Sequence, residues 1–189
     1  MLSVCYANID SVPDSPEGLS LSAYRLEKLA SCRFARHRRQ GIGAELLLIR
    51  AIRSVSSDLQ LPLAIVAGPD GKPYLPGSAL HFSLSHSGSF AACAISDHPV
   101  GLDLELRGRM SEPLLRRSFS PEEQAIVRAA EDPDLLFTRL WTGKESYVKA
   151  TGQGILFPLR DIQPQDPPPG VSFWQRCNDH VATMYRSRE

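Results

Sequence analysis

One long helix with clear signals at both ends is the feature that most limits how this chain can fold. Asp132 and Pro133 are typical of a helix N-terminus, where a side-chain acceptor precedes a proline at the first helical position. Gly152 stands where a left-handed C-terminal residue belongs, so we expect this helix to continue to about Ala150. The preceding tetrapeptide Ser120-Pro121-Glu122-Glu123 is a capping box and predicts the start of a second helix.

The rest of the chain alternates irregularly between helical and extended patterns. Apolar residues three or four positions apart predict two further helices, from Ser20 to Ala30 and from about Ile42 to Val55. Short apolar segments predict strands at Leu63 to Ala67, Phe90 to Ile95, Val100 to Leu106, Val171 to Trp174 and Val181 to Tyr185. The proline-rich segment from Pro164 to Gly170 is predicted to be a loop. Because the alternation is too irregular for a doubly wound sheet, we predict an α+β fold.

The charge balance limits the kinds of partner that the chain can attract. With 21 basic and 21 acidic residues in 189, no global charge favours nucleic acid or a membrane surface as a partner. Electrostatic recognition must therefore be local, and the basic cluster from Arg33 to Arg39 is one candidate. No apolar run is long enough to span a bilayer, and the stretch from Met1 to Pro13 does not resemble a secretory signal.

The cysteines bear on the cellular compartment. Cys5, Cys32, Cys93 and Cys177 are scattered along the chain and form no C-x-x-C pair. In a chain without a secretory signal we expect free thiols instead of two disulfides. The predicted compartment is the cytoplasm.

Two carboxylates alternate along the predicted strand from Val100 to Leu106. Asp103 and Glu105 project from the same face of such a strand, about 7 Å apart, while Leu102 and Leu104 project from the other. Two carboxylates so arranged can share a hard divalent cation such as Mg2+. An ordinary edge strand with its polar face in water would have the same pattern, so this segment alone leaves both interpretations open.

A second polar group lies on the long predicted helix. Trp141, Glu145 and Lys149 are spaced i, i+4 and i+8 and therefore share one side of the helix. An isolated Glu–Lys pair at this spacing is usually a solvated surface pair that contributes only about 0.3–0.5 kcal/mol. The neighbouring tryptophan and the nearby helix end indicate partial burial, but this segment alone still favours the ordinary surface pair over a functional group.

A third segment combines hydroxyls with an imidazole. Ser83 and Ser85 would share a strand face, and His86 then begins a turn rich in serine and glycine. Adjacent hydroxyls, an imidazole and free backbone N–H groups are suited to binding phosphate. A serine hydrolase is the competing interpretation, but the chain contains no G-x-S-x-G motif. A zinc site is disfavoured, because no pair of histidines or cysteines has ligand spacing.

Four motifs follow one another in the part of the chain between residues 71 and 154. They are Gly71-Lys72-Pro73, Phe82-Ser83-Leu84-Ser85-His86-Ser87-Gly88, Gly101-Leu102-Asp103-Leu104-Glu105 and Trp141-x-x-Lys144-Glu145-Ser146-x-x-Lys149. In order and spacing this set resembles the 4′-phosphopantetheinyl transferases of the surfactin-synthetase-activating type. The N-terminal third resembles that family more loosely, through its basic cluster and the helix that follows.

The resemblance implies a fold of two similar α/β halves related by a pseudo-twofold axis. The halves would be residues 1–98 and 99–189 of a monomer, with coenzyme A bound in the cleft between them. Asp103, Glu105 and Glu145 match the Mg2+ ligands of the family, two from a strand and one from a helix. Contacts with coenzyme A are implied for Lys72, Ser85, His86, Lys144, Lys149 and Arg33.

The resemblance also implies an activity, which is transfer of the 4′-phosphopantetheine group of coenzyme A to a serine of an apo acyl or peptidyl carrier protein. The products would be the holo carrier protein and 3′,5′-ADP. The implied catalytic residues are Glu145 as the base, directly or through water, with Lys149 and His86 at the phosphates. A non-catalytic coenzyme A-binding relative, or another metal-dependent phosphotransferase or nuclease, remains an alternative.

Overall fold

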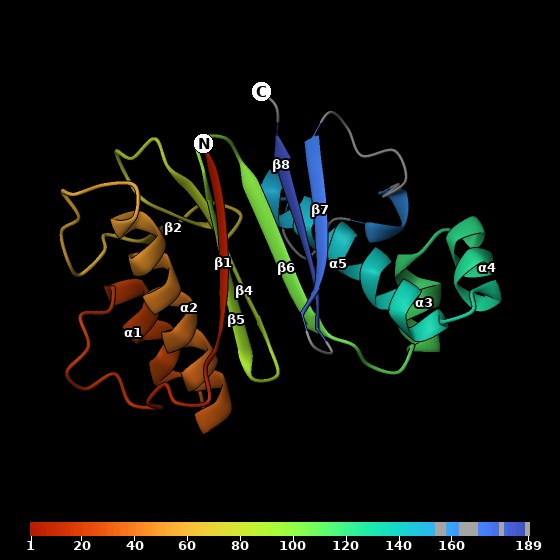
Figure 1. The fold of residues 1–189 in the computed structure, drawn as a ribbon, viewed down its shortest axis with the longest axis horizontal. Coiled ribbons are helices and arrows are strands. Elements are labelled where there is room, and N and C mark those ends of the chain that lie inside the picture. The colour runs from red at the N-terminus through yellow and green to blue at the C-terminus, as the bar shows by residue number, and fades with distance from the viewer. Residues whose placement is uncertain (154–157, 163–169, 178–179, 188–189) are drawn as a thin grey trace.

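Two three-stranded antiparallel sheets form the centre of the molecule, with helices on both sides (Figure 1). The computed structural model describes residues 1–153, 158–162, 170–177 and 180–187. The first sheet has the order β1-β5-β4, formed by Leu2–Asn8, Phe90–Ser96 and His81–Ser87. The second has the order β6-β8-β7, formed by Val100–Leu106, His180–Ser187 and Gly170–Cys177. Each sheet thus has its first strand at one edge and its last strand in the middle.

The helices gather in two groups, α1 and α2 beside the first sheet and α3, α4 and α5 beside the second (Figure 1). Their bounds are Ala23–Ala30 for α1, Ala35–Arg53 for α2, Glu112–Ser118 for α3, Pro121–Ala129 for α4 and Pro133–Thr151 for α5. A short 3-10 helix, η1, spans Leu159–Asp161, and the two-residue strands β2 (Val66–Ala67) and β3 (Pro73–Tyr74) pair with each other. The fold is therefore a mixed α/β arrangement, as predicted.

The predicted helix ends are confirmed by their hydrogen bonds. The side chain of Ser120 accepts from the backbone N–H of Glu123 at 3.2 Å, and the Glu123 carboxylate accepts from the backbone N–H of Ser120 at 2.8 Å. At the start of α5, Asp132 accepts from the Leu135 backbone N–H at 3.0 Å. At its end, Gly152 has φ = 72°, in the left-handed region where glycine is favoured.

Several predicted bounds differ from the observed ones. Helix α2 begins at Ala35 instead of Ile42, because its first turns carry solvated basic side chains outside the buried apolar stripe. Only the last two residues of the predicted strand from Leu63 to Ala67 have a pairing partner, in β3. The loop was predicted from Pro164 to Gly170. Its residues 164–169 lie outside the described residues, and Gly170 belongs to β7. Strand β1 and helix α3 were not predicted. Strand β1 lies at the edge of its sheet, and its residues are at most half-buried.

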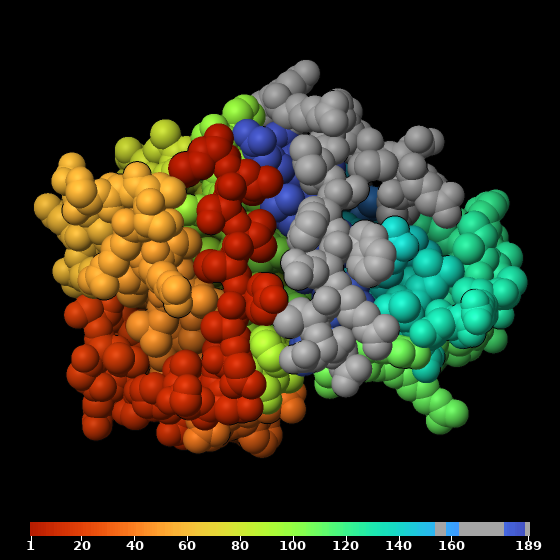
Figure 2. All heavy atoms as spheres, in the orientation of Figure 1, coloured from red at the N-terminus to blue at the C-terminus, as the bar shows by residue number. Residues whose placement is uncertain are grey.

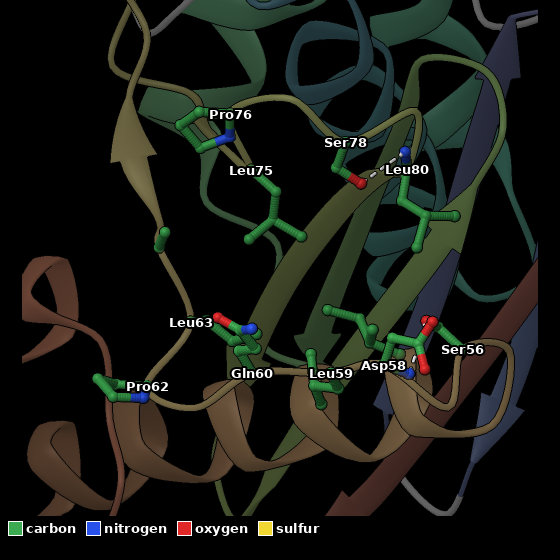
Figure 3. Close-up of a pocket in the computed structure, with 12 residues that line it drawn as sticks. Ser56, Asp58, Leu59, Gln60, Pro62, Leu63, Leu75, Pro76, Ser78 and Leu80 are labelled. Carbon is green, nitrogen blue, oxygen red and sulfur yellow. Dashed lines mark hydrogen bonds between the residues drawn. The ribbon is translucent and has the colours of Figure 1, made fainter.

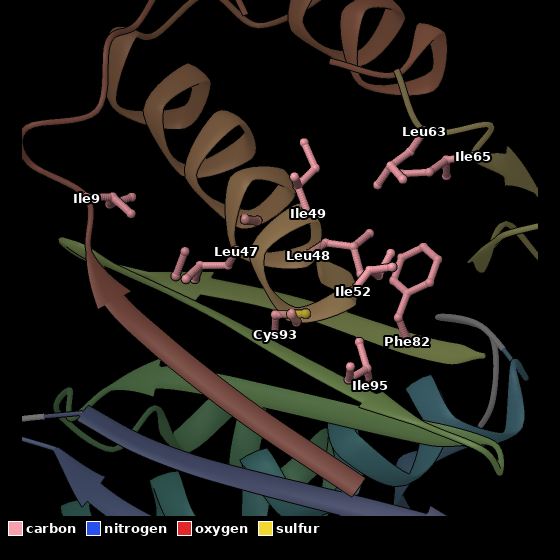
Figure 4. Packing of buried hydrophobic residues seen from close by; sticks show 13 residues of the cluster. Ile9, Leu47, Leu48, Ile49, Ile52, Leu63, Ile65, Phe82, Cys93 and Ile95 are labelled. Atoms are coloured by element: carbon pink, nitrogen blue, oxygen red, sulfur yellow. The ribbon is translucent and has the colours of Figure 1, made fainter. Parts of the chain in front are cut away.

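Helix α2 covers one face of the first sheet and forms the larger core with it. Leu48 of α2 and both Cys93 and Ile95 of β5 have no exposed surface, and Phe82 of β4 is nearly as deeply buried. Figure 4 shows the α2 side chains pointing toward these strand residues. Burying such side chains contributes about 25 cal/mol per Å2 of apolar surface, which attaches α2 firmly to the sheet.

The opposite face of the first sheet carries small residues and packs against β6. Ala92 and Ala94 of β5 form a second core with Leu102 and Leu104 of β6 and with Met184 of β8. This contact confirms the predicted alternation along β6, because the leucines point into this core. The odd-numbered residues of β6 therefore face the other way, toward α5.

Candidate active site

Strands β4 and β6 are connected by serine hydroxyls. Each hydroxyl accepts a hydrogen bond from a backbone N–H of β6, namely Ser83 from Leu102 (2.9 Å), Ser85 from Leu104 (3.1 Å) and Ser87 from Leu106 (2.9 Å). The residue numbers rise together along both strands, so β4 and β6 run in the same direction. We call Ser83, Ser85 and Ser87 the serine seam, because they join the first sheet to the second.

Two hydroxyls of the serine seam also hold the predicted metal ligands. Ser85 donates to Oδ1 of Asp103 at 3.0 Å, and Ser87 donates to Oε2 of Glu105 at 2.9 Å. Lys149 Nζ donates to the Ser85 hydroxyl at 3.2 Å. A hydroxyl has one donor and two acceptor lone pairs, so all three positions of Ser85 are occupied by protein partners. The phosphate contact predicted for Ser85 stays a prediction, and it would require the hydroxyl to exchange a partner.

Gly101 allows helix α5 to lie close enough to β6 for the two predicted catalytic segments to meet. A Cβ atom at Gly101 would fall 1.8 Å from the backbone oxygen of Ser146 in α5. This close approach brings Lys149 Nζ to 2.5 Å from Oδ1 of Asp103. The Asp103 side chain is almost fully buried, whereas about a third of the Lys149 side chain is exposed, at 32%. Asp103 and Lys149, from separate motifs, therefore form one ion pair.

Negative charge accumulates around this ion pair. Burial raises the pKa of Glu105, and the negative charge of Asp103 raises it further. Burial and the same aspartate also raise the pKa of Glu145 on α5. The ammonium of Lys149 opposes both shifts. Three carboxylates thus share one nearby lysine, an arrangement that a divalent cation would stabilise.

The donor set fits a hard cation. Oδ2 of Asp103 is buried and has no hydrogen-bond partner, so one oxygen of the central carboxylate is free to coordinate. Among the described residues, no three His, Cys, Asp or Glu side chains converge closely enough to hold a metal ion by themselves. Mg2+ does not require such a cage, because it usually binds one or two carboxylates together with waters and substrate phosphates. Asp103, Glu105 and Glu145 carry carboxylate oxygens of the type that Mg2+ prefers, and their assignment as metal ligands stays a prediction.

Positive charge gathers on the other side of the site, around His86. His86 is exposed, yet desolvation by the surrounding chain lowers the pKa of its imidazole, and the charges of Arg25, Lys149 and His37 lower it further. Arg25 was not among the site residues predicted from the sequence. Its Nε lies 3.3 Å from Oε2 of Glu45, which is fully buried in α2. A glutamate within the apolar stretch of α2 was the available signal, since a buried carboxylate requires a cationic partner.

Lys72, the lysine of the first motif, is bound to the backbone of the other half. Its Nζ donates to the carbonyl oxygen of Ala150 at 2.8 Å and to that of Val100 at 3.2 Å. Burial lowers the pKa of Lys72 to about 8. Lys72 therefore joins the N-terminal half to the C-terminal end of α5 and to the start of β6. An ammonium has three donors, so one remains for the phosphate contact that stays predicted for this residue.

Lys144 and Arg33, which were also predicted to contact coenzyme A, lie in very different surroundings. Lys144 is fully buried, and its Nζ contacts the carbonyl oxygens of Leu159 (2.8 Å) and Ile162 (2.5 Å) and the Glu123 carboxylate (2.9 Å). These partners attach η1 and α4 to α5, so the ammonium serves the fold. Arg33 is exposed just before α2. The predicted coenzyme A contacts of both residues stay predictions.

Comparisons with known proteins agree with these motifs. A family model described as the 4′-phosphopantetheinyl transferase superfamily matches residues 99–189. The chain is 33% identical over 153 residues to a 4′-phosphopantetheinyl transferase of Bacillus subtilis, an alignment that covers 76% of this chain and 66% of the relative. It is 31% identical over 121 residues to 4′-phosphopantetheinyl transferase gsp of Aneurinibacillus migulanus, covering 63% of this chain and 46% of the relative. Residues 99–189 of the chain belong to the 4′-phosphopantetheinyl transferase superfamily.

The part of the chain that the family model matches contains all three predicted metal ligands and Lys149. A further relative, 4′-phosphopantetheinyl transferase HetI of a Nostoc species, is 43% identical over 94 residues and covers 45% of this chain and 40% of the relative. The chain thus spans less than two thirds of the length of the relatives that it matches, at 66%, 46% and 40% in these three cases. No helix among the described residues is both long enough and apolar enough to cross a membrane.

A pocket of about 350 Å3 lies apart from the candidate site, between the C-terminal end of α2 and the segments 58–64 and 75–80 (Figure 3). Its walls include Leu59, Leu63 and Leu75. None of the predicted site residues lines it. The pocket therefore has no part in the chemistry considered for Asp103 and its neighbours.

Proposed function

We propose that this chain transfers the 4′-phosphopantetheine group of coenzyme A to a serine of an apo acyl or peptidyl carrier protein and releases 3′,5′-ADP, in a reaction that requires Mg2+. The observation that carries the proposal is the position of Asp103. Its Oδ1 contacts both Ser85 and Lys149, and its Oδ2 is buried and free, in the part of the chain that belongs to the 4′-phosphopantetheinyl transferase superfamily. Pantetheine transfer is a phosphoryl-type transfer, which depends on charge stabilisation at this kind of site.

The proposed metal ligands are Asp103, Glu105 and Glu145, with the pyrophosphate of coenzyme A and waters completing the coordination. When bound, Mg2+ would neutralise the pyrophosphate and act as a Lewis acid at the phosphorus. The hydrogen bonds from Ser85 and Ser87 would hold two of these carboxylates in position. Such supporting contacts commonly determine the orientation of metal ligands.

Glu145 is the proposed base for the carrier serine hydroxyl, directly or through a water. Its raised pKa makes it a better proton acceptor than an unperturbed carboxylate. Lys149 would neutralise charge on the phosphate that leaves with 3′,5′-ADP, and its partly exposed ammonium is able to reach such a group. His86 would contact coenzyme A phosphates, supported by the positive charge of Arg25.

Coenzyme A is proposed to lie in a cleft between the two halves, residues 1–98 and 99–189, related by a pseudo-twofold axis. The common strand order of the two sheets supports this relation. Lys72 is proposed to contact the 3′-phosphate with its remaining donor, with His86 or the cluster from Arg33 to Arg39 as the alternatives. Ser85 and Lys144 are further candidates for contacts with coenzyme A, and each would have to exchange one of its present partners. The monomeric state and the cytoplasmic location stay predictions, as does the identity of the carrier protein.

The proposed activity is tested by mixing the protein with coenzyme A, Mg2+ and a panel of apo carrier proteins. Intact mass spectrometry should show a gain of one phosphopantetheine on at least one carrier, and none when coenzyme A is omitted, when Mg2+ is chelated or when the carrier serine is replaced by alanine. Binding of coenzyme A without any mass gain would support a non-catalytic relative instead. Cleavage of phosphodiesters without coenzyme A would support another metal-dependent enzyme.

The serine seam offers a matched pair of variants that tests the proposed metal site. Ser87→Ala removes a bond to the backbone of β6 and the bond to Glu105, whereas Ser83→Ala removes only a bond to that backbone. Both variants should lose about 1 kcal/mol of unfolding free energy. Only Ser87→Ala should weaken binding of Mg2+ or Mn2+, by roughly tenfold.

Urea unfolding and Mn2+ titration followed by electron paramagnetic resonance measure these two effects separately. Because the titration needs no turnover, it reports on the carboxylates alone. Equal cation affinity in the two variants would mean that Ser87 does not position Glu105 for a metal.

A further inference from the structure

Two cysteines face each other across neighbouring strands, far along the sequence from each other. Cys5 of β1 and Cys93 of β5 are direct partners in the antiparallel register. Cys5 also packs against the core cluster that contains Cys93, and each thiol shifts the pKa of the other. Cys93 is fully buried beneath α2 (Figure 4), whereas Cys5 is only half-buried. Figure 2 shows β1 as a column of red spheres along the surface, so one member of the pair lies in a strand open to solvent.

The spacing of this pair follows from the strand pattern. The two-residue turn between β4 and β5 makes Ser87 and Phe90 a hydrogen-bonded pair. Backbone groups of a middle strand alternate in direction, so Cys93, three residues after Phe90, points its N–H and C=O toward β1. The bond from the backbone N–H of Ile9 to the Ser89 oxygen has the direction that this pattern requires. Cys5 and Cys93 are therefore a hydrogen-bonded pair with Cα atoms about 5.5 Å apart.

That separation lies within the range of roughly 4.4–6.8 Å that a disulfide spans. We propose that Cys5 and Cys93 are a thiol–disulfide exchange site that forms a reversible intramolecular disulfide on reaction with a low-molecular-weight disulfide such as oxidised glutathione. The third described free cysteine, Cys32, lies between α1 and α2 and has no facing thiol in the register of the described strands.

The two thiols have different parts in the exchange. The Cys93 thiol and the positive charge of Arg50 lower the pKa of Cys5 to about 7, although burial opposes them. The pKa of Cys93 is raised, by the Cys5 thiol and by burial. The more exposed sulfur is therefore the one that ionises first, and the thiolate is the nucleophile in exchange reactions.

The chemistry balances with one molecule of oxidised glutathione. The Cys5 thiolate attacks one glutathione sulfur, which forms a mixed disulfide and releases a glutathione thiolate. That thiolate takes the proton of Cys93, and the Cys93 sulfur attacks Cys5 to release the second glutathione. Two protein thiols are oxidised, and one disulfide is reduced to two thiols.

The crosslink would leave the candidate active site in place. Cys93 faces α2, whereas its neighbours Ala92 and Ala94 face β6 on the other side of the sheet. The disulfide would join the N-terminal strand to the middle strand of its sheet. We therefore expect the oxidised chain to lose two hydrogen atoms of mass, to unfold at higher urea concentration and to keep the Mn2+ affinity of the reduced chain.

The experiment exposes the folded chain to oxidised glutathione, blocks remaining thiols with iodoacetamide and maps the peptides by mass spectrometry. The wild type and the control Cys32→Ser should both give a Cys5–Cys93 linked peptide that dithiothreitol reverses. Cys93→Ser, or Cys93→Ala if the serine variant does not fold, should stop at a glutathione adduct on Cys5. Cys5→Ser should leave Cys93 without an adduct.

Three outcomes would overturn the proposal. These are a stable glutathione adduct on Cys5 in the wild type, a crosslink that involves another cysteine, or no reaction of Cys5 at glutathione concentrations that modify Cys32. The result does not depend on pantetheine transfer, so it stands or falls separately from the proposed enzymatic function.

Discussion

Asp103→Ala is expected to abolish pantetheine transfer, with a loss in kcat on the order of 10³-fold or more. The Asp103 carboxylate contacts the serine seam through Ser85 and helix α5 through Lys149. Removing it takes away the central proposed metal ligand, and metal stabilisation of transferring phosphoryl groups contributes several kcal/mol. The fold should survive, because the partly exposed ammonium of Lys149 is able to recover water.

The measurement combines single-turnover transfer assays with urea unfolding and Mn2+ titration. Asp103→Asn is the matched variant, since it keeps the shape of the side chain and an acceptor for Ser85 but removes the charge. Both variants should be folded, bind Mn2+ weakly and transfer pantetheine at a greatly reduced rate. A near-normal, Mg2+-dependent rate in either variant would refute the assignment of Asp103 to the metal.

Gly101→Ala should be the most destabilising single-methyl addition in the C-terminal half. Its Cβ would fall 1.8 Å from the Ser146 backbone oxygen and 2.4 Å from the Ala150 backbone nitrogen. Backbone atoms within a helix cannot rotate out of the way, so α5 must move as a whole. The expected cost is about 3 kcal/mol or more, or roughly 6–12 °C in Tm for a chain of this size. Movement of α5 would also separate Lys149 from Asp103 and lower the transfer rate.

Gly108→Ala is the control for this change. A Cβ atom at Gly108 would meet only the Leu106 backbone oxygen, at an ordinary contact distance of 3.8 Å. The Gly101→Ala variant should therefore have a Tm several degrees below that of Gly108→Ala. Its urea unfolding midpoint should also be clearly lower. Equal stability of the Gly101→Ala and wild-type chains would show that α5 does not depend on this close approach.

Features that depend on a few neighbouring residues could be predicted from the sequence. The capping box at Ser120 and the left-handed Gly152 have the predicted geometry, because caps involve only residues within one helical turn. The strand from Val100 to Leu106 has the predicted bounds, and its leucines face the core as the alternation required. By contrast, β1 was not predicted, because this edge strand is only partly buried and its sequence has no strong apolar alternation.

The partners of the site residues could not be predicted in the same way. Two lysines illustrate this, because Lys72 and Lys144 have the motif positions of ligand-binding residues, yet their ammonium groups contact backbone carbonyls of distant segments. It could not be predicted from the sequence either that three protein groups occupy all hydrogen-bonding positions of the Ser85 hydroxyl. Such contacts depend on which segments pack together, and residue type and spacing do not contain that information.

The sequence by itself determined the chemical groups, namely two carboxylates on one strand face and a glutamate and a lysine on one helix side. The four ordered motifs of the sequence also indicated the protein family that the chain resembles. Only the tertiary structure decided that Lys149 meets Asp103 and that serines connect the two sheets. The reason is physical: residues 46 positions apart meet only where packing permits, and here Gly101 lacks the Cβ atom that would keep α5 away from β6.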